Sequence, residues 1–318
     1  MTLVSSDISK AVSFLGDEDV VAIPTETVYG LAGNIFSEKA IHKIFEVKQR
    51  PLFNPLIVHL HSLDQVKEIT SEFPEKAQLL AKHFWPGPLT LILKKKSIVP
   101  DVITAGKDTV AIRIPNHPVT QNLLKELPFP IAAPSANPFN RISPTKSSHV
   151  ASYFKDQIPM VLEGGECNNG IESTIIGFEN DQVILYRLGS IAIEDIEKVV
   201  GSIQVKNKKE SSPNAPGMLA KHYSPKTKMR FVDSIETFVF ENPTLSIGIV
   251  QFMGTPISKS NTHTEILSPS GDLKEAASNL YNALHTLDHL NLDIIITEKF
   301  PDRELGKSIN DRLERATK

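Results

Sequence analysis

Phe45–His59 reads FEVKQRPLFNPLIVH, and this stretch predicts a helix that gives way to a buried strand. The apolar residues around its start follow helical spacing, whereas Leu56–Val58 is a short apolar run that follows a proline. The turn between them is stiffened by two prolines and carries Lys48, Arg50 and Asn54. Two cations on a rigid turn can grip a polyphosphate, because Arg offers a planar fork and Lys a point charge. A solvated basic turn is the alternative.

Composition and charge limit the kinds of protein that this chain can be. It has 318 residues, of which 40% are apolar and 22% charged, as is usual for a globular chain of two domains. The net charge of -3 gives no general attraction to nucleic acid or membrane. The single cysteine, Cys167, excludes an intramolecular disulfide and a cysteine-based metal cluster. We find no signal peptide and no run near the ~20 apolar residues of a membrane span, so we expect a cytoplasmic enzyme without membrane contact.

A second polar turn follows the apolar run Val20–Ile23, where residues 24–31 read PTETVYGL. Open α/β sheets bind ligands at the carboxyl ends of buried strands, so the hydroxyl and carboxyl groups of this turn are candidate ligand contacts. The alternative is structural, because Thr25 or Thr27 can simply cap a following helix.

Seven motifs in order between residues 20 and 190 resemble those of the threonylcarbamoyl-AMP synthase family, the YrdC-like enzymes of tRNA modification. They are PTETVYGL at 24–31, KQRP with NPLIVH at 48–59, FWPGPLT at 84–90, VAIRIP at 110–115, PSAN with SPT at 134–145, EST at 172–174 and RLG at 187–189. One such motif is a weak signal, but seven in the right order make chance agreement implausible. The chain departs from the family at residues 139–142, FNRI, where a Ser-Gly-x-Pro run is usual.

The resemblance implies one reaction, in which L-threonine, bicarbonate and ATP with Mg2+ give threonylcarbamoyl-AMP and pyrophosphate. A nucleotidyltransferase of this kind serves the t6A modification of tRNA, so its product passes to the tRNA threonylcarbamoyl transferase machinery. The carboxylated amine of threonine attacks the α-phosphorus of ATP. Fixed cations and Mg2+ stabilise the charge that gathers on the phosphates, and positioning supplies most of the rest. The ligands of the metal are left open.

The resemblance also assigns two sets of substrate contacts. We expect ATP to be held by Lys48, Arg50, Asn54, Thr109, Ser135, Ser143, Arg187 and Tyr223, with Lys48 and Arg50 also catalytic. We expect L-threonine to be held by Thr27, His59, Arg113, Ala133 and Ser173. Arg113 alternates with apolar residues along a predicted strand, and a buried Arg needs an anion. The threonine carboxylate is the candidate, with a structural salt bridge as the alternative. For His59 the alternative is a histidine at a strand end without a role.

The predicted architecture is α/β, with two domains. Residues 1–204 form a YrdC-like open twisted mixed sheet with helices, residues 205–228 a linker, and residues 229–318 a smaller Rossmann-like α/β domain. The linker is rich in turn formers, yet it carries His222 and Tyr223, which can exclude water if they dock over a pocket. We expect the C-terminal domain to be a stabilising or regulatory appendage without chemistry.

Two other functions stay open on the sequence alone. An RNA-binding module can use the same basic pocket for a phosphate backbone, and weak RNA contact is compatible with the enzyme as well. A hydrolase of misformed carbamoyl or acyl adducts is the third reading, but the G-x-S-x-G signature of many serine hydrolases is missing. Pyrophosphate release that depends on threonine separates the enzyme from both.

Overall fold

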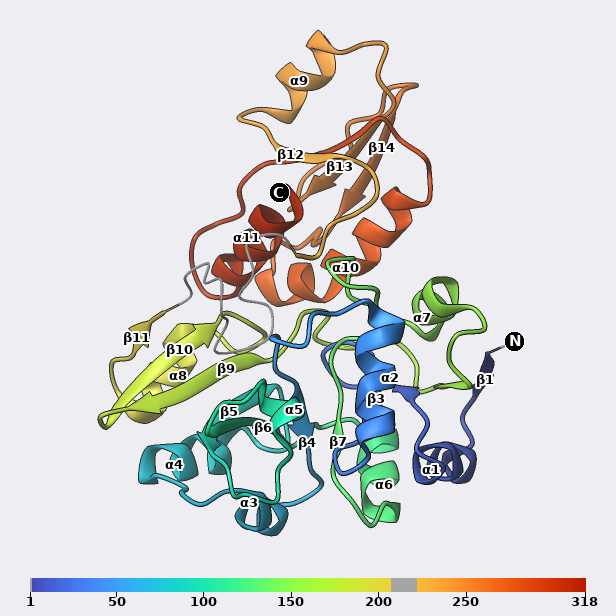
Figure 1. Ribbon diagram of the computed structural model, residues 1–318. Helices are drawn as coiled ribbons and strands as arrows, with labels where there is room; N and C mark the ends of the chain where they lie inside the picture. The colour runs from blue at the N-terminus through green and yellow to red at the C-terminus, as the bar shows by residue number, and fades with distance from the viewer. Residues whose placement is uncertain (1, 207–221) are drawn as a thin grey trace.

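The computed structural model describes residues 2–206 and 222–318, which form two α/β units (Figure 1). Most of the predicted linker, residues 207–221, lies outside the described residues. The two-unit α/β architecture predicted from the sequence is confirmed. The boundaries at residues 204 and 229 stay predictions.

The larger unit is built on one mixed sheet. In chain order its strands are β1 (Leu3–Ser5), β2 (Val21–Ile23), β3 (Gly30–Asn34), β4 (Ile57–His59), β5 (Leu89–Lys94), β6 (Thr109–Arg113), β7 (Ile131–Ala132), β8 (Met160–Leu162), β9 (Thr174–Glu179), β10 (Gln182–Arg187) and β11 (Gln204–Val205). Across the sheet they run β1-β8-β2-β3-β7-β4-β6-β5-β9-β10-β11. Strand β4 pairs in parallel with β6, which places His59 beside Arg113, and antiparallel with β7. Two predicted substrate contacts therefore meet on neighbouring strands.

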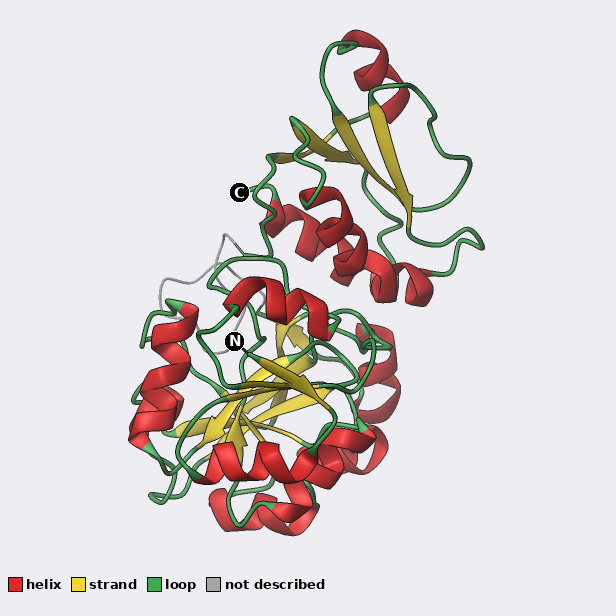
Figure 2. Ribbon diagram, turned by 90° about the vertical axis from the view of Figure 1, so that its right-hand side faces the viewer, coloured by secondary structure: helices red, strands yellow, loops and turns green. Residues whose placement is uncertain are grey.

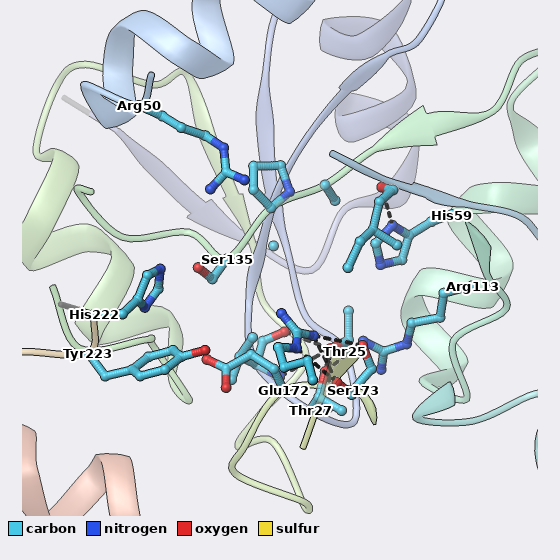
Figure 3. A pocket seen from close by; sticks show the side chains of 16 residues that line it. Thr25, Thr27, Arg50, His59, Arg113, Ser135, Glu172, Ser173, His222 and Tyr223 are labelled. Carbon is cyan, nitrogen blue, oxygen red and sulfur yellow. Dashed lines mark hydrogen bonds between the residues drawn. The ribbon is translucent and has the colours of Figure 1, made fainter. Parts of the chain in front are cut away.

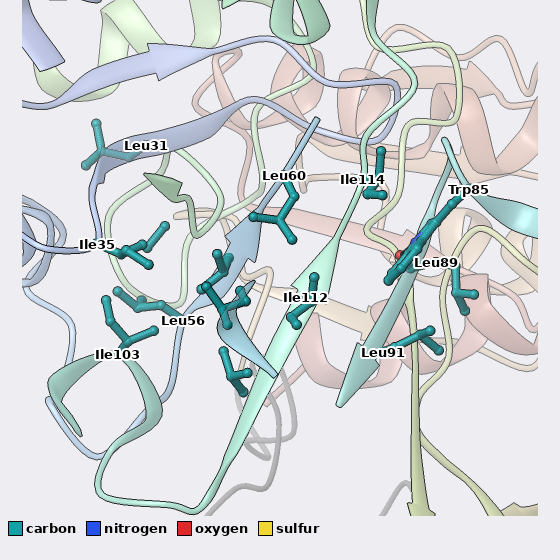
Figure 4. Packing of buried hydrophobic residues seen from close by; sticks show 14 of the residues in the cluster. Leu31, Ile35, Leu56, Leu60, Trp85, Leu89, Leu91, Ile103, Ile112 and Ile114 are labelled. Carbon is teal, nitrogen blue, oxygen red and sulfur yellow. Dashed lines mark hydrogen bonds between the residues drawn. The ribbon is translucent and has the colours of Figure 1, made fainter. Parts of the chain in front are cut away.

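Helices surround this sheet (Figure 2). They are α1 (Ile8–Gly16), α2 (Glu38–Lys48), α3 (Leu63–Ile69), α4 (Glu75–Phe84), α5 (Asp101–Thr104), α6 (Pro118–Glu126), α7 (Ser147–Phe154) and α8 (Ile193–Val200). Ser37 caps the start of α2 by accepting from the Ala40 amide, and Gln49 ends it in the left-handed conformation. The main core packs between helices and sheet and includes Leu31 and Trp85 (Figure 4). Burying one large side chain of this kind contributes about 1.5–3 kcal/mol.

The turn after β2 is not a helix cap, so that alternative is wrong. The Thr25 hydroxyl donates to the Val28 carbonyl, and the chain returns as β3, antiparallel to β2. Strand β3 packs closely on α2, because a Cβ at Gly33 would lie 3.0 Å from the Ile44 side chain of that helix. The turn is therefore held in place by its own hydrogen bonds and by a packed strand behind it.

The smaller unit has a parallel sheet, as predicted. Its strands are β12 (Met229–Phe231), β13 (Ile247–Gln251), β14 (Thr262–Ile266) and β15 (Ile294–Thr297), in the order β12-β15-β13-β14. Its helices are α9 (Ile235–Glu241), α10 (Leu273–Asp288) and α11 (Leu305–Ala316). Helices α10 and α11 lie on the side of this unit that faces the larger one (Figure 1). Helix α11 is polar in sequence, yet several of its polar side chains are buried.

Candidate active site

A cavity lies over one face of β4 and β6, bordered by the turn after β2 and by the loop after β7. We call it the central cavity, and its polar lining consists of Thr25, Thr27, Arg50, His59, Arg113, Ser135, Glu172, Ser173, Arg187, His222 and Tyr223. Figure 3 shows His59 and Arg113 on one side of the hollow, with His222 and Tyr223 across from them. Residues that are far apart in the sequence, from Thr25 to Tyr223, thus line one cavity.

The residues predicted from the sequence are distributed unevenly around this cavity. The whole predicted threonine set lines it, namely Thr27, His59, Arg113, Ala133 and Ser173. From the predicted ATP set, the lining includes Arg50, Ser135, Arg187 and Tyr223. Lys48, Asn54 and Ser143 are buried but are not among the lining residues, and Thr109 lies elsewhere. Their roles toward ligands remain predictions.

Arg113 is held between a hydroxyl and a carboxylate. It donates from Nη1 to Thr27 Oγ1 at 2.8 Å, and its Nη2 lies 2.7 Å from Glu26 Oε1. The other oxygen of Glu26 accepts from the Asn116 amide at 3.0 Å. The structural salt bridge that we named as the alternative is therefore present, because a buried guanidinium without an anion is costly. The sequence indicated the carboxyl group of Glu26 as a candidate ligand contact but not its pairing with Arg113.

His59 is a neutral side chain in this cavity. Burial, followed by the nearby Arg113 charge, lowers its pKa to about 3. Its Nδ1 lies 3.1 Å from the Ile57 carbonyl oxygen, which can only accept, so the ring donates from Nδ1. In a neutral ring the other nitrogen, Nε2, then carries a lone pair. His59 is built to accept a hydrogen bond rather than to supply charge.

The two cations of the basic turn differ in their surroundings. Arg50 lines the cavity and donates to the Pro55 carbonyl at 2.8 Å and to the Asn54 carbonyl at 3.2 Å. Lys48, at the end of α2, donates to the carbonyls of Ser135 and Asn137 and so holds the loop after β7. Burial, followed by repulsion from Arg50, lowers the pKa of Lys48. Neither cation has an ion-pair partner among the described residues, but only Arg50 lines the cavity, so it is the one placed to meet an anionic ligand there.

Arg187 fixes the start of β9 at the edge of the cavity. It donates from Nη2 to the Ser173 carbonyl at 2.8 Å and to the Ser173 hydroxyl at 3.0 Å. The same hydroxyl lies 2.7 Å from the Thr90 hydroxyl. Gly189 packs directly against the backbone of Ser173 and Thr174, since a Cβ at Gly189 would lie 2.4 Å from the Thr174 nitrogen. The RLG and EST motifs are thus one packed unit in space.

Glu172 is the carboxylate that sequence reasoning left without a role. It lines the cavity and accepts from the Ser143 hydroxyl at 2.6 Å, which directs Ser143 to this carboxylate. Burial disfavours its ionised form, but the charges of Arg312 and Arg187 outweigh burial and keep the pKa of Glu172 below its usual value. The EST motif marked this position, but nothing near it in the sequence indicates Arg312 as its partner.

Thr109 is not brought to the central cavity. It lies at the other end of β6 and lines a separate hollow with Lys107 and Tyr186. Because side chains alternate along a strand, Thr109 shares a face with Arg113, about 13 Å away at ~3.3 Å per residue. A small apolar cluster that includes Ile57 and Ala111 covers this face between them. The predicted ATP contact at Thr109 therefore requires a ligand that extends along the sheet.

Several buried polar atoms next to the cavity lack a hydrogen-bond partner within the described residues. They include both side-chain atoms of Asn54, Nδ1 of His222 and the Tyr223 hydroxyl. An unpaired buried polar atom costs about 1–3 kcal/mol, so such atoms mark places where a ligand or water supplies the partner. His222 and Tyr223, predicted as candidates to dock over a pocket, are buried against it.

Residues 2–206 and 222–318 contain neither a cluster of metal ligands nor a membrane-spanning helix. No group of three or more His, Cys, Asp or Glu side chains there is placed to hold a metal ion. No helix there is both long enough and apolar enough to cross a membrane.

Known proteins resemble the chain along almost its whole length. A family model described as telomere recombination, Sua5/YciO/YrdC, matches residues 13–189, and one described as threonylcarbamoyl-AMP synthase, C-terminal domain, matches residues 191–317. A threonylcarbamoyl-AMP synthase of Pyrococcus abyssi is 39% identical over 96% of this chain and 93% of its own, and one of Bacillus subtilis is 38% identical over 97% and 92%. The crystal structure of P. abyssi Sua5 complexed with L-threonine matches with a TM-score of 0.92 at 36% identity, covering 99% of this chain and 98% of that one.

Proposed function

This chain belongs to the threonylcarbamoyl-AMP synthase family, and from that membership we propose that it condenses L-threonine, bicarbonate and ATP to threonylcarbamoyl-AMP and pyrophosphate. In chemical class it is then a nucleotidyltransferase. One observation carries the proposal, which is that the five residues expected to hold threonine line the same cavity as Arg50 and Arg187. An amino acid and a triphosphate bound there lie close enough to react.

The charged and the neutral residues of the cavity have different roles in this reaction. Arg113 receives the threonine carboxylate while Glu26 stays beside it, and Thr27 holds the guanidinium in place. His59 accepts a hydrogen bond through Nε2 and adds no positive charge next to the reacting amine. Arg50 and Arg187 lie where the phosphates bind, and they stabilise the charge that develops as pyrophosphate leaves. Lys48 supports this step by holding the loop that carries Ser135.

Magnesium enters this scheme as part of the substrate. Mg2+ keeps several waters and binds through one or two carboxylates plus substrate phosphates, so it needs no cage built from the protein alone. Glu172 is a poor ligand for it, because its oxygens already accept from Ser143, Tyr281 and Arg312. We therefore propose that the ion arrives on the ATP phosphates and neutralises part of their charge. The threonine amine condenses with bicarbonate, with loss of water, and an oxygen of the resulting carbamate attacks the α-phosphorus and displaces pyrophosphate.

We place the reaction in the cytoplasm, where ATP and tRNA are both present. The product, a mixed anhydride, is labile in water and must pass quickly to the tRNA threonylcarbamoyl transferase machinery. His222 and Tyr223, buried at the cavity, protect it from water until it leaves. Direct RNA contact by this chain is weak at most, in keeping with its net charge of -3.

The proposed function is tested by measuring pyrophosphate release with ATP, bicarbonate and one amino acid at a time. We expect release with L-threonine, and much less with serine or valine, because each lacks one group that the cavity recognises. Omission of bicarbonate should stop the release that depends on threonine. Equal release with all amino acids, or salt-sensitive RNA binding without any release, would overturn the proposal.

A further inference from the structure

The smaller unit reaches the central cavity through a buried ion pair. Nε of Arg312, on α11, lies 2.9 Å from Oε2 of Glu172, which lines the cavity. Nη2 of the same guanidinium donates to the Leu188 carbonyl at 2.6 Å, and the Tyr223 ring lies 4.8 Å away. The hydroxyl of Tyr281, on α10, donates to Glu172 at 3.0 Å. Two side chains of the smaller unit thus hold one carboxylate of the larger unit.

The charge of this carboxylate matters because of its position. Glu172 lies beside Arg187, and an unpaired carboxylate there would repel phosphates and compete with them for that guanidinium. The other acidic residue next to the lining, Glu26, is already paired with Arg113. With Arg312 in place, the cavity keeps a net positive charge on the side of Arg50 and Arg187.

We propose that Arg312 and Tyr281 are positioning residues for ATP binding, which hold Glu172 toward the smaller unit and neutralise its charge. With its charge compensated by Arg312, Glu172 repels the phosphates that bind near Arg50 and Arg187 less strongly. This inference rests on the proposed function and adds a role for the C-terminal unit in it. That unit is then more than an appendage without chemistry, because its Arg312 forms the ion pair with Glu172 and adds to the charge of Arg187 from the larger unit.

Two cationic residues of α11, Lys307 and Arg312, make it possible to distinguish an effect on Glu172 from the mere loss of an ion pair between the two units. Lys307 of α11 forms an ion pair of 2.7 Å with Glu194 of the larger unit, half-exposed and outside the lining of the cavity. Both ion pairs join the two units, but only that of Arg312 reaches Glu172. Lys307→Ala therefore tests the loss of an ion pair between the units, and Arg312→Met tests the loss of charge compensation at the cavity.

The experiment compares the KM values for ATP and for threonine in Arg312→Met, Lys307→Ala and the full-length wild type. We expect Arg312→Met to raise the KM for ATP about 10- to 100-fold, and that for threonine much less, because repulsion acts on the phosphates. Lys307→Ala should leave both near the wild-type values. Adding Glu172→Gln to Arg312→Met should restore most of the ATP affinity, since the amide still accepts from Ser143 without carrying a charge.

The defect should also depend on pH. The charged or titratable side chains around Glu172 are Arg312, Arg187, Tyr223 and Tyr281. Without Arg312, burial raises the pKa of Glu172, so at low pH the carboxyl group is neutral and at high pH it repels ATP. The KM for ATP of Arg312→Met should therefore rise with pH more steeply than that of the wild type, and Glu172→Gln should remove the difference.

If Arg312→Met does not fold, the same KM values are measured in the double variant Arg312→Met with Glu172→Gln and in Tyr281→Phe. Tyr281→Phe removes one donor to Glu172, and we expect a rise of about 2- to 10-fold in the KM for ATP that Glu172→Gln suppresses. Unchanged KM values, or a loss that Glu172→Gln does not restore, would overturn the positioning role. Absence of threonine-dependent pyrophosphate release in the wild type would instead overturn the proposed function.

Discussion

At the scale of single residues, the chemistry of the cavity depends on which cations already have an anion. Arg113 is paired with Glu26, whereas Arg50 donates only to backbone carbonyls in the described contacts. Because the two guanidinium groups have different surroundings, we expect Arg50 to contact the phosphates of ATP and Arg113 to contact threonine. Two substitutions separate these parts.

Arg50→Ala should weaken catalysis with little effect on folding. Loss of one oriented donor at developing charge lowers transition-state stabilisation by about 2–4 kcal/mol, read from kcat/KM. Lys43→Ala, on the helix α2 that precedes Arg50, is the control, because Lys43 forms a surface ion pair with Asp19 that is worth at most ~1 kcal/mol. An Arg50→Ala enzyme with the kcat/KM of the control would show that this guanidinium does not act on the phosphates.

Arg113→Lys should weaken threonine binding more than ATP binding. A lysine cannot reproduce the planar fork that holds Thr27 and Glu26 and receives a carboxylate. Titration calorimetry with each ligand alone measures the two affinities. A larger loss for ATP would reassign Arg113 to the nucleotide.

At the scale of elements, close packing between motifs positions the side chains of the cavity. Gly189 lies against the backbone of Ser173, whose hydroxyl lines the cavity and bonds to Arg187. Helices α7 and α10, from different units, meet through stacked rings of His149 and His285 with centroids 3.8 Å apart. Each of these contacts predicts a measurable effect.

Gly189→Ala should destabilise the protein and weaken threonine binding together. The new Cβ would lie 2.4 Å from backbone atoms of Ser173 and Thr174, so the strand start must shift, at a cost of about 1–3 kcal/mol in unfolding free energy. Gly16→Ala, at the end of α1, is the control, because nothing lies within 4 Å of its Cβ position. Equal stability and threonine affinity in the two variants would rule out this role for Gly189.

The free energy of unfolding should rise with pH between about 4 and 6.5. Burial lowers the pKa of His149 to about 3 and that of His285 to about 4, so the unfolded chain binds more protons in this range. The stability from these rings is complete above the unfolded pKa near 6.5 and is lost as pH falls toward the folded values. Each ring contributes a slope of up to about 1.4 kcal/mol per pH unit. Denaturant unfolding of His149→Phe should show a shallower pH slope than the wild type, and an identical slope would contradict this account.

At the scale of the whole molecule, the sequence predicted most regular elements but not their long-range contacts. Apolar patterns predicted the end of α2, the strand β4 and the strand β2, whereas β3 was missed because GLAGN, residues 30–34, has two glycines and no alternation. The threonine set was identified through motifs. The contact between Glu172 and Arg312 could not be predicted, because a buried arginine in a polar helix looks like a solvated one.

In the proposed reaction one chain joins threonine, bicarbonate and the adenylate of ATP in one cavity. The decisive measurement is mass spectrometry of the nucleotide product formed from ATP, L-threonine and isotope-labelled bicarbonate. We expect a product that contains AMP, one threonine and one labelled carbon. A product of AMP alone, or an adenylate of threonine without the label, would contradict it.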